Sequence, residues 1–478
     1  MEDGKSKGEE AQQCGGGGAH SDEVEPLVAP DFQLQALGSR FARCICFAAG
    51  SLGVMAALVL AFVVVLSTQH RSASSSEISR PLRVLDKPLV ILISSDGFRW
   101  GYQWKVPTPN IDRLISNGTE AFPGMIPVYP SVTFPNHYSI ATGLYPAWHG
   151  IVANYFRDPV RSSNETFFMG NLNAKWWIGE PIWETVVKNG LEAAVYFWPG
   201  SQVVRKSWPC RPEICPSYNK SVPFEVRVDA VLGYLDLPQR PSFIGLYFEE
   251  PDEEGHQVGP DAPQISAAIT RVDSMIGRLL EGLEKRNILE EVTIIMVGDH
   301  GMVGTCDKKL IFLEDLERWI QIPKEWVDST SPVLAITPPL DVDAKVVVEK
   351  MKQGLASGSV ANGEFLQVYL KEDLPSRLHY SSSERIQPII GMVEEGYKVE
   401  LTRPRKTHTE CGGAHGYDNL LVSMRTIFIG HGPQFARGKK VPSFVNVEVY
   451  NVIATILGIN GTSNNGTTAF PQSILLSK

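Results

Sequence analysis

The chain has 478 residues, of which 43% are hydrophobic and 20% charged, and a formal net charge of −9. This composition is ordinary for a globular protein and excludes a chain that is mostly disordered or of low complexity. The acidic balance argues against a protein that grips nucleic acid phosphates, so we expect no nucleic-acid partner. A mean hydropathy of −0.07 excludes a multi-pass membrane protein.

A single apolar segment near the N-terminus predicts a membrane anchor. Residues 44–69 carry no charge, and a helix rising about 1.5 Å per residue over this length spans a hydrocarbon core of about 30 Å. A cleavable signal peptide is the alternative, but 43 residues precede the segment, which is also longer than a typical signal core. We therefore interpret 1–43 as a disordered cytosolic tail, 44–69 as an uncleaved transmembrane signal anchor and 70–86 as a stalk.

Glycosylation sequons and cysteines predict which side of the membrane the body occupies. Five N-x-S/T sequons follow the apolar segment and none precedes it, a skew that favours a glycosylated body. They are Asn117, Asn164, Asn219, Asn460 and Asn465. The prediction is a single-pass type II membrane protein of the secretory pathway or cell surface, with a lumenal or extracellular body.

Cysteine placement agrees with this orientation. Four of the seven cysteines follow the anchor, namely Cys210, Cys215, Cys306 and Cys411. An even number suits two disulfides in an oxidising compartment, and the first two are close enough in sequence to close a small loop. Four unpaired, buried thiols are the alternative.

The body alternates strands with helices. Residues 89–93, 243–248 and 292–297 are continuous apolar runs, which are typical of strands buried on both faces. Between the second and third runs, residues 265–283 repeat apolar side chains at helical spacing. This alternation predicts an α/β fold with a largely parallel central sheet flanked by helices.

Each of the three predicted strands leads into an aspartate, namely Asp96, Asp252 and Asp299. One such aspartate is unremarkable, because aspartate starts turns and caps helices. Here histidines accompany them: His256 and His300 lie close behind, and His415 lies in a glycine-rich loop. Ligands of parallel sheets bind beyond the carboxyl ends of the strands. Three aspartates and three histidines at that edge suit two metal ions such as Zn²⁺.

Thr133 is the candidate nucleophile. It precedes a short helical stretch that Gly143 ends, and a helix N-terminus favours a bound anion or phosphate. A threonine hydroxyl is a poor nucleophile at neutral pH unless a base or a metal deprotonates it. The alternative is that Thr133 only caps the helix.

Together these segments resemble the nucleotide pyrophosphatase/phosphodiesterase family of the alkaline phosphatase superfamily. The similarity covers nearly all of the chain after Lys87, in order. Matching segments include I-S-S-D-G-F-R at 93–99, T-F-P-N-H-Y at 133–138, E-E-P-D-E-E-G-H-Q-V-G-P at 249–260, G-D-H-G-M at 298–302 and A-H-G-Y-D-N at 414–419. The resemblance implies an alkaline-phosphatase-like catalytic domain over 87–478, with a small inserted lobe at about 315–409.

The resemblance also implies the roles of the site residues. One zinc ion would be held by Asp96, Thr133, Asp299 and His300, and a second by Asp252, His256 and His415. Thr133 would form a phosphothreonine intermediate, from which water releases a nucleoside 5′-monophosphate. Asn136 is similar to the side chain that stabilises a phosphoryl oxygen in the family. Cys306 and Cys411 resemble a family disulfide that ties together the loops of His300 and His415.

The substrate class follows less directly from the resemblance. Phe134 and Tyr218 look like the aromatic pair that sandwiches a nucleotide base, with Trp198 at the pocket edge; an ordinary packed tyrosine is the alternative for Tyr218. Asn171 stands near the position where some relatives carry a lysine for terminal phosphates. Nucleotide sugars and dinucleotides are therefore at least as plausible as triphosphates.

Two other functions stay open. One is a choline-phosphodiester or lysophospholipid hydrolase on the same scaffold, and the other is a non-catalytic binding ectodomain that uses zinc structurally. We expect a small-molecule substrate and the membrane as partners, and no obligate protein partner is evident from the sequence.

Overall fold

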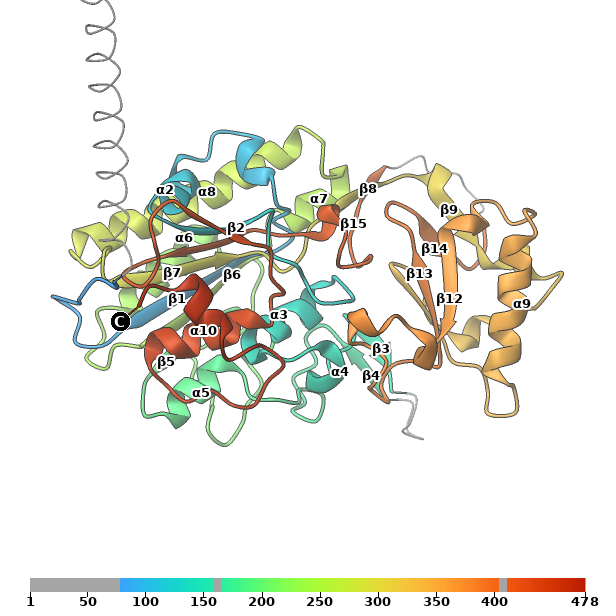
Figure 1. Cartoon of the computed structure of the whole chain (residues 1–478), viewed down its shortest axis with the longest axis horizontal. Helices are drawn as coiled ribbons and strands as arrows, with labels where there is room; N and C mark the ends of the chain where they lie inside the picture. The colour runs from blue at the N-terminus through green and yellow to red at the C-terminus, as the bar shows by residue number, and fades with distance from the viewer. Residues whose placement is uncertain (1–77, 159–164, 404–410, 478) are drawn as a thin grey trace, which may run out of the picture. The chain divides into compact units, whose positions relative to one another are not determined.

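The computed structural model describes residues 78–158, 165–403 and 411–477 (Figure 1). The chain divides into two units, 1–72 and 73–478, and all of the described residues belong to the second. The predicted tail, the predicted anchor, the first part of the stalk and Asn164 lie outside the described residues. Within the described ranges, no helix combines the length and apolar character needed to cross a membrane.

A seven-stranded sheet forms the centre of this unit. Its strands are, in sheet order, β17 (Lys439–Pro442), β2 (Gly118–Phe122), β16 (Phe428–His431), β7 (Val292–Val297), β1 (Leu89–Ser95), β6 (Phe243–Phe248) and β5 (Ala193–Tyr196). β1 pairs in parallel with both β6 and β7, and β16 runs antiparallel to its two neighbours. The predicted α/β fold with a largely parallel sheet is confirmed, and the three predicted strands are β1, β6 and β7.

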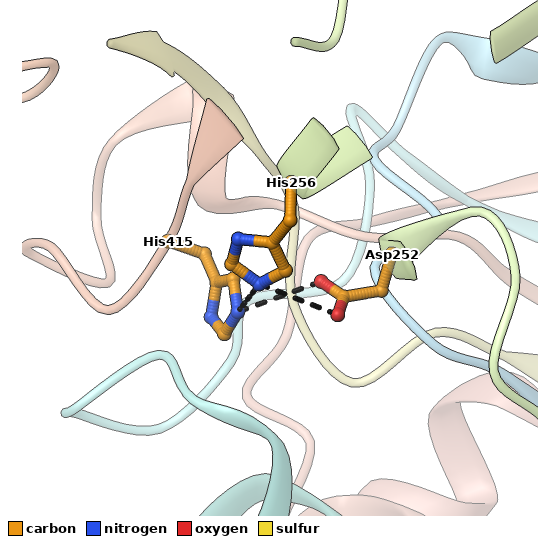
Figure 2. A group of neighbouring side chains, drawn as sticks. All are labelled: Asp252, His256 and His415. Atoms are coloured by element: carbon orange, nitrogen blue, oxygen red, sulfur yellow. Dashed lines mark hydrogen bonds and ion pairs between the residues drawn. The ribbon is translucent and has the colours of Figure 1, made fainter. Parts of the chain in front are cut away.

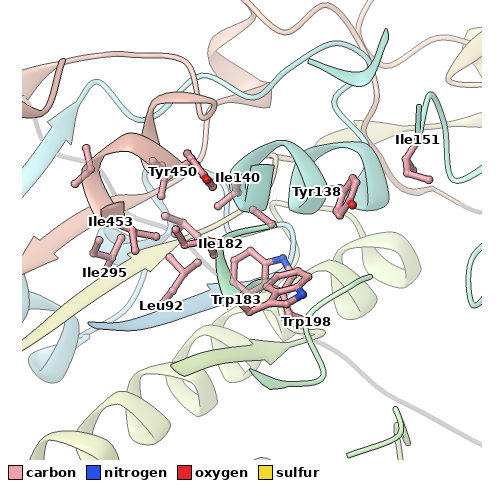
Figure 3. Packing of buried hydrophobic residues seen from close by; sticks show 14 of the residues in the cluster. Leu92, Tyr138, Ile140, Ile151, Ile182, Trp183, Trp198, Ile295, Tyr450 and Ile453 are labelled. Carbon is pink, nitrogen blue, oxygen red and sulfur yellow. The ribbon is translucent and has the colours of Figure 1, made fainter. Parts of the chain in front are cut away.

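Alternate residues of β1 enter two separate cores, one on each face of the sheet. Val90 and Leu92 belong to one core, whereas Ile91 and Ile93 belong to the other, because successive side chains of a strand point to opposite faces. Trp183 and Tyr450 share the core of Leu92 (Figure 3). Every residue of β1 is buried, which explains its continuous apolar sequence.

Helices cover both faces of the sheet. The core of Leu92 includes residues from α3 (Thr133–Thr142), α5 (Ile182–Lys188) and α10 (Glu448–Leu457). The opposite core includes residues from α2 (Pro109–Ser116), α6 (Phe224–Tyr234) and α8 (Gln264–Lys285). α8 contains the predicted amphipathic helix, and its buried side chains follow the predicted helical spacing.

A second, smaller sheet lies within the range predicted for the inserted lobe. Its four antiparallel strands are, in order, β10 (Val327–Ser329), β11 (Val333–Ile336), β13 (Ile389–Val393) and β12 (Leu366–Leu370). Helix α9 (Ala344–Ala356) lies beside β12 (Figure 1) and buries Val347 and Met351 in a core shared with this sheet. Two further strands pair in parallel with each other: β9 (Leu310–Phe312), which precedes the strands of this sheet in the sequence, and β14 (Lys398–Glu400), which follows them.

Several short elements complete this unit. They are α4 (Pro146–His149), α7 (Asp252–Val258), α11 (Phe470–Ile474) and the antiparallel pairs β3 (Tyr155–Arg157) with β4 (Thr166–Phe168) and β8 (Val303–Thr305) with β15 (Gly412–Ala414). Both predicted disulfides are present: Cys210 bonds to Cys215, and Cys306 bonds to Cys411 beside the β8–β15 pair.

The predicted glycosylation sites differ in exposure. Asn219 and Asn460 are exposed, whereas Asn117 and Asn465 are half-buried. The side-chain oxygen of Asn465 accepts a hydrogen bond from the backbone N–H of Tyr145 at 2.9 Å. Glycan attachment at these positions stays a prediction.

The burial of Leu92 in the central core predicts that its replacement by alanine destabilises the protein much more than the same replacement of the exposed Leu340. Leu92→Ala removes a side chain that is fully buried and should lower the free energy of unfolding by about 2–5 kcal/mol through lost burial and a residual cavity. Leu340→Ala, at a fully exposed position, is the matched control and should leave the free energy of unfolding almost unchanged. Chemical denaturation of both variants measures the difference, and equal effects would contradict this core.

Candidate active site

Three neighbouring strands bring the aspartates together. Ser94 of β1 lies opposite Tyr247 of β6 and Val297 of β7, so the three strands end at the same level. Asp96 follows β1, Asp299 follows β7, and Asp252 begins α7 shortly after β6. The carboxyl edge of the sheet therefore gathers three carboxylates, as the strand pattern predicts.

Gly97 allows this close approach. Its φ is +63°, and a Cβ atom there would lie 2.7 Å from the Cβ of Asp252. The backbone N–H of Asp252 donates to the carbonyl oxygen of Asp96 at 3.0 Å. A side chain at position 97 would separate the ends of β1 and α7, so glycine is required here on steric and conformational grounds.

Asp96, Asp299 and His300 form the first ligand group. One ligand atom from each lies within 4.8 Å of the others, and His300 Nε2 is 3.0 Å from Asp299 Oδ2 and 3.5 Å from Asp96 Oδ1. The hydroxyl of Thr133 lies 3.3 Å from the same His300 nitrogen. All four side chains are buried. The first group therefore places the predicted nucleophile beside potential metal ligands.

Asp252, His256 and His415 form the second ligand group (Figure 2). His256 Nε2 lies 3.4 Å from Asp252 Oδ2 and 3.0 Å from His415 Nε2, and His415 Nε2 lies 3.4 Å from Asp252 Oδ1. The rings of His300 and His415 stack at 3.5 Å between centroids. The two groups are therefore adjacent parts of one site.

Backbone carbonyls orient all three imidazoles. His256 Nδ1 lies 3.0 Å from the oxygen of Gly413, His300 Nδ1 lies 2.9 Å from that of Gly301, and His415 Nδ1 lies 3.0 Å from that of Ser131. A carbonyl oxygen only accepts, so each Nδ1 carries a proton, and in the neutral form of each ring Nε2 has a lone pair for a metal ion. This arrangement is typical of histidines that bind metal.

Unpartnered carboxylate oxygens provide a test of whether the site fits cations. Among the described residues, the buried atoms Asp96 Oδ1, Asp252 Oδ1 and Asp299 Oδ2 have no hydrogen-bond partner. The other oxygens are held: Tyr247 donates its hydroxyl to Asp96 Oδ2 at 2.6 Å, and the N–H of Gly97 donates to Asp299 Oδ1 at 2.9 Å. Buried anionic oxygens without partners are costly, so this donor set fits divalent cations.

The ionisable groups of the two ligand groups have shifted pKa values. Burial, together with the nearby charges of Asp299 and Asp252, raises the pKa of Asp96 well above its usual value. Burial and the neighbouring His300 and His256 lower the pKa of His415 well below its usual value. Cations between these groups would stabilise the carboxylates and the neutral imidazoles. Protons compete for the same ligand atoms, so metal affinity should fall as the pH is lowered.

Asn136 does not reach the cavity at the site, contrary to the expectation from the resemblance. It is fully buried, its amide nitrogen donates to the carbonyl oxygens of Pro130 and Val132, and its oxygen accepts from the N–H of Val128. Asn446 donates to the same oxygen at 2.8 Å. Asn136 therefore fixes the loop that leads into α3 and Thr133.

Asn154 is the asparagine that lines the cavity, and the sequence analysis missed it. Its side-chain oxygen accepts from the backbone N–H of Phe134 at 2.8 Å, next to Thr133. It occurs in A-N-Y-F, where no motif singles it out. Only the return of the chain to the start of α3 reveals its position.

A cavity of about 580 Å³ opens over the two ligand groups. Its walls include the predicted substrate residues Phe134, Trp198 and Tyr218 as well as Thr133. Trp198 is buried and donates its ring N–H to the carbonyl oxygen of His137 at 3.1 Å, whereas Tyr218 is half-exposed. The structure therefore gathers the expected aromatic residues around the nucleophile.

One lysine at this cavity also escaped the sequence analysis. Lys220 lines it and pairs with Glu253. Asn171 does not line the cavity, although Gly170 and Leu172 do. The cavity thus holds one lysine whose charge is shared with a neighbouring carboxylate.

Tyr247 offers a test of how Asp96 is held. Tyr247→Phe removes the hydroxyl that donates to Asp96 Oδ2 and should weaken metal binding about tenfold to a hundredfold, as losses of such supporting hydrogen bonds do. Tyr234→Phe is the matched control, because Tyr234 is a buried tyrosine of α6 in the hydrophobic core on the other face of the sheet from Leu92. Competition with a fluorescent chelator measures affinity, and equal affinity for both variants would contradict this role.

Comparisons with known proteins agree with this geometry. Residues 90–418 match the family model described as type I phosphodiesterase/nucleotide pyrophosphatase. A venom phosphodiesterase of Macrovipera lebetinus is 40% identical over 412 residues, which cover 84% of this chain and 46% of the relative. An uncharacterized pyrophosphatase/phosphodiesterase of Schizosaccharomyces pombe is 38% identical over 387 residues, which cover 79% of this chain and 78% of the relative. The chain thus spans about half the length of the venom relatives it matches.

A solved structure shares the fold. It is the murine ectonucleotide pyrophosphatase/phosphodiesterase 5, an inactive variant in complex with AMP. It is 32% identical, with a TM-score of 0.72, and the match covers 81% of this chain and all of that one.

Proposed function

The chain belongs to the type I phosphodiesterase/nucleotide pyrophosphatase family, and we propose that it is a zinc-dependent hydrolase that releases nucleoside 5′-monophosphates. Its substrates would be nucleotides, dinucleotides or nucleotide sugars. The observation that carries this proposal is the Thr133 hydroxyl, which lies beside two adjacent ligand groups in the wall of an aromatic-lined cavity. A binding ectodomain would not require a hydroxyl in that position.

Two zinc ions suit the ligand groups. Asp96, Asp299, His300 and Thr133 would hold one ion, and Asp252, His256 and His415 would hold the other. Mixed imidazole and carboxylate ligands are typical of zinc. Bound there, the ions supply Lewis acidity and lower the pKa of a hydroxyl or of water.

Thr133 would carry out the first chemical step. Its hydroxyl loses its proton to solvent as Oγ forms a bond to the phosphorus next to the nucleoside. The bond from phosphorus to the bridging oxygen breaks, and the electron pair leaves with that oxygen. Water then attacks the phosphothreonine, and the nucleoside monophosphate departs while the threonine hydroxyl is regenerated. The N-terminal position of Thr133 in α3 adds favourable electrostatics for the phosphoryl group.

Asn154 would stabilise the developing negative charge. Because Phe134 N–H holds the side-chain oxygen of Asn154, the amide nitrogen is left to donate to a phosphoryl oxygen. A prearranged donor of this kind typically contributes about 10²–10³ in rate. We assign to Asn154 the role that the resemblance suggested for Asn136.

The aromatic cavity supports a nucleotide substrate. Phe134 and Tyr218 both line it, and we propose that the base stacks between them. The related murine protein was solved in complex with AMP, which is the product expected from an adenine nucleotide. Attachment through the segment 44–69, a lumenal or extracellular body and glycosylation at the exposed sequons complete the proposal.

Replacing the nucleophile tests the covalent mechanism. Thr133→Ala should reduce turnover of a nucleotide phosphodiester at least about a thousandfold, because no other hydroxyl replaces the attacking oxygen. Thr133→Ser retains a hydroxyl and should keep measurable activity. Both variants should keep the parent's melting temperature and, in excess zinc, nearly its metal content, because Asp96, Asp299 and His300 remain. Wild-type turnover by the alanine variant would contradict the mechanism.

Metal removal and a substrate panel test the rest of the function. Chelation should abolish turnover and added zinc should restore it, because the ligand groups leave three carboxylate oxygens unpartnered.

The substrate panel contains ATP, NAD, a nucleotide sugar and glycerophosphocholine. We expect nucleoside monophosphate release from the first three. Turnover of only the choline diester would favour the alternative hydrolase, and no turnover of any would favour a binding ectodomain.

A further inference from the structure

A second cavity of about 450 Å³ lies where the inserted lobe meets the central fold, a size within the usual range of about 300–1,000 Å³ for small-molecule sites. We propose that it binds the departing half of the substrate through an uncharged, hydroxyl-bearing group. That group is the sugar of a nucleotide sugar or the second ribose of a dinucleotide. This inference rests on the proposed function and assigns a substrate class to it.

The second cavity adjoins only one of the two ligand groups. His256, His415 and Asn154 line both cavities, so the two spaces meet above the second ligand group. Thr133 and Asp96 line only the first cavity. The nucleophile and the stacking residues therefore share the first cavity, and the second extends away from the Thr133 hydroxyl.

The direction of the reaction places the leaving group there. In phosphoryl transfer, the attacking and leaving oxygens lie roughly in line on opposite sides of phosphorus. The attacking oxygen belongs to Thr133, beside the first ligand group. The bridging oxygen would depart past the second ligand group, and whatever is attached to the second phosphate would extend into the second cavity.

Charge in the second cavity disfavours a bare pyrophosphate. Lys398 is the only lysine or arginine among the described residues that line it; Glu400 contributes a carboxylate, and the carboxylate of Asp328 is paired with Arg157. Departing pyrophosphate carries about three negative charges at neutral pH, and this lining offers it no net positive charge. A sugar phosphate leaves its charge at the second ligand group and brings only hydroxyls to this wall.

Polar, uncharged side chains form part of the lining, beside apolar residues such as Val132 and Ile390. Ser329, Thr330 and Gln387 contribute hydroxyl and amide groups, and Tyr155 presents a ring that is 54% exposed. Hydroxyl and amide groups exchange hydrogen bonds with sugar hydroxyls, and an exposed aromatic ring packs against the C–H face of a sugar.

The wall of the cavity is held in place before any ligand binds. Arg157 of β3 pairs with Asp328 of β10 at 2.6 Å, across the junction of the central fold and the lobe. Thr337 donates its hydroxyl to the other oxygen of Asp328, and Gln387 donates to the carbonyl oxygen of Arg157. Such preorganisation reduces the entropy lost on binding.

Three substrates with the same adenylyl half test the assignment. ADP-ribose and diadenosine diphosphate carry a sugar beyond the second phosphate, and ATP does not. Thr330→Trp, on the loop after β10, fills the cavity and should lower kcat/KM for the two sugar-bearing substrates about tenfold or more while changing that for ATP by less than about twofold. Leu340→Trp, at a fully exposed position of the lobe, is the matched control and should change none of the three.

Tyr155→Ala provides a second variant that does not add bulk. It should lower kcat/KM for the sugar-bearing substrates about threefold or more and leave ATP unchanged. A loss for ADP-ribose alone, or for diadenosine diphosphate alone, identifies which sugar the cavity binds. Equal changes for all three substrates, or no change in either folded variant, would overturn this inference while leaving the proposed function intact. A parent enzyme that turns over none of the three would contradict both.

Discussion

Buried negative charge is the constraint on which the active site depends. β1, β6 and β7 are adjacent, parallel and level at their carboxyl ends, so Asp96, Asp252 and Asp299 converge on one edge of the sheet. Each contributes a buried oxygen without a hydrogen-bond partner. Bound cations would neutralise this charge, and the three imidazoles, each held through Nδ1 by a carbonyl oxygen, would complete the coordination.

The rest of the fold positions ligands that the sheet alone cannot supply. His415 is far from the three strands in sequence and reaches the centre through the pairing of β15 with β8, beside the disulfide between Cys306 and Cys411. The lobe inserted between these segments forms one wall of the second cavity. One edge of the sheet therefore carries the chemistry, and the inserted lobe adds the surface that would select the leaving group.

Much of this architecture follows from local sequence patterns. Fully buried strands are visible as apolar runs, and the residue after such a strand is placed by topology, which is why Asp96 and Asp299 were predictable. Asn136 and Asn154 were not distinguishable in the same way. The hydrogen bonds of a buried amide depend on which distant backbone groups surround it, and the sequence near Asn154 contains no motif. One wall of the second cavity is likewise held by the ion pair between Arg157 and Asp328, which are 171 positions apart in the sequence.

Crystallography with anomalous scattering at the zinc edge tests the central claim most directly. Crystals of the purified body grown with zinc should show two anomalous peaks, one among Asp96, Asp299, His300 and Thr133 and one among Asp252, His256 and His415. The peaks should be absent below the edge. Crystals grown in excess zinc that show no peak at either group, or that show zinc bound only elsewhere, would contradict the account.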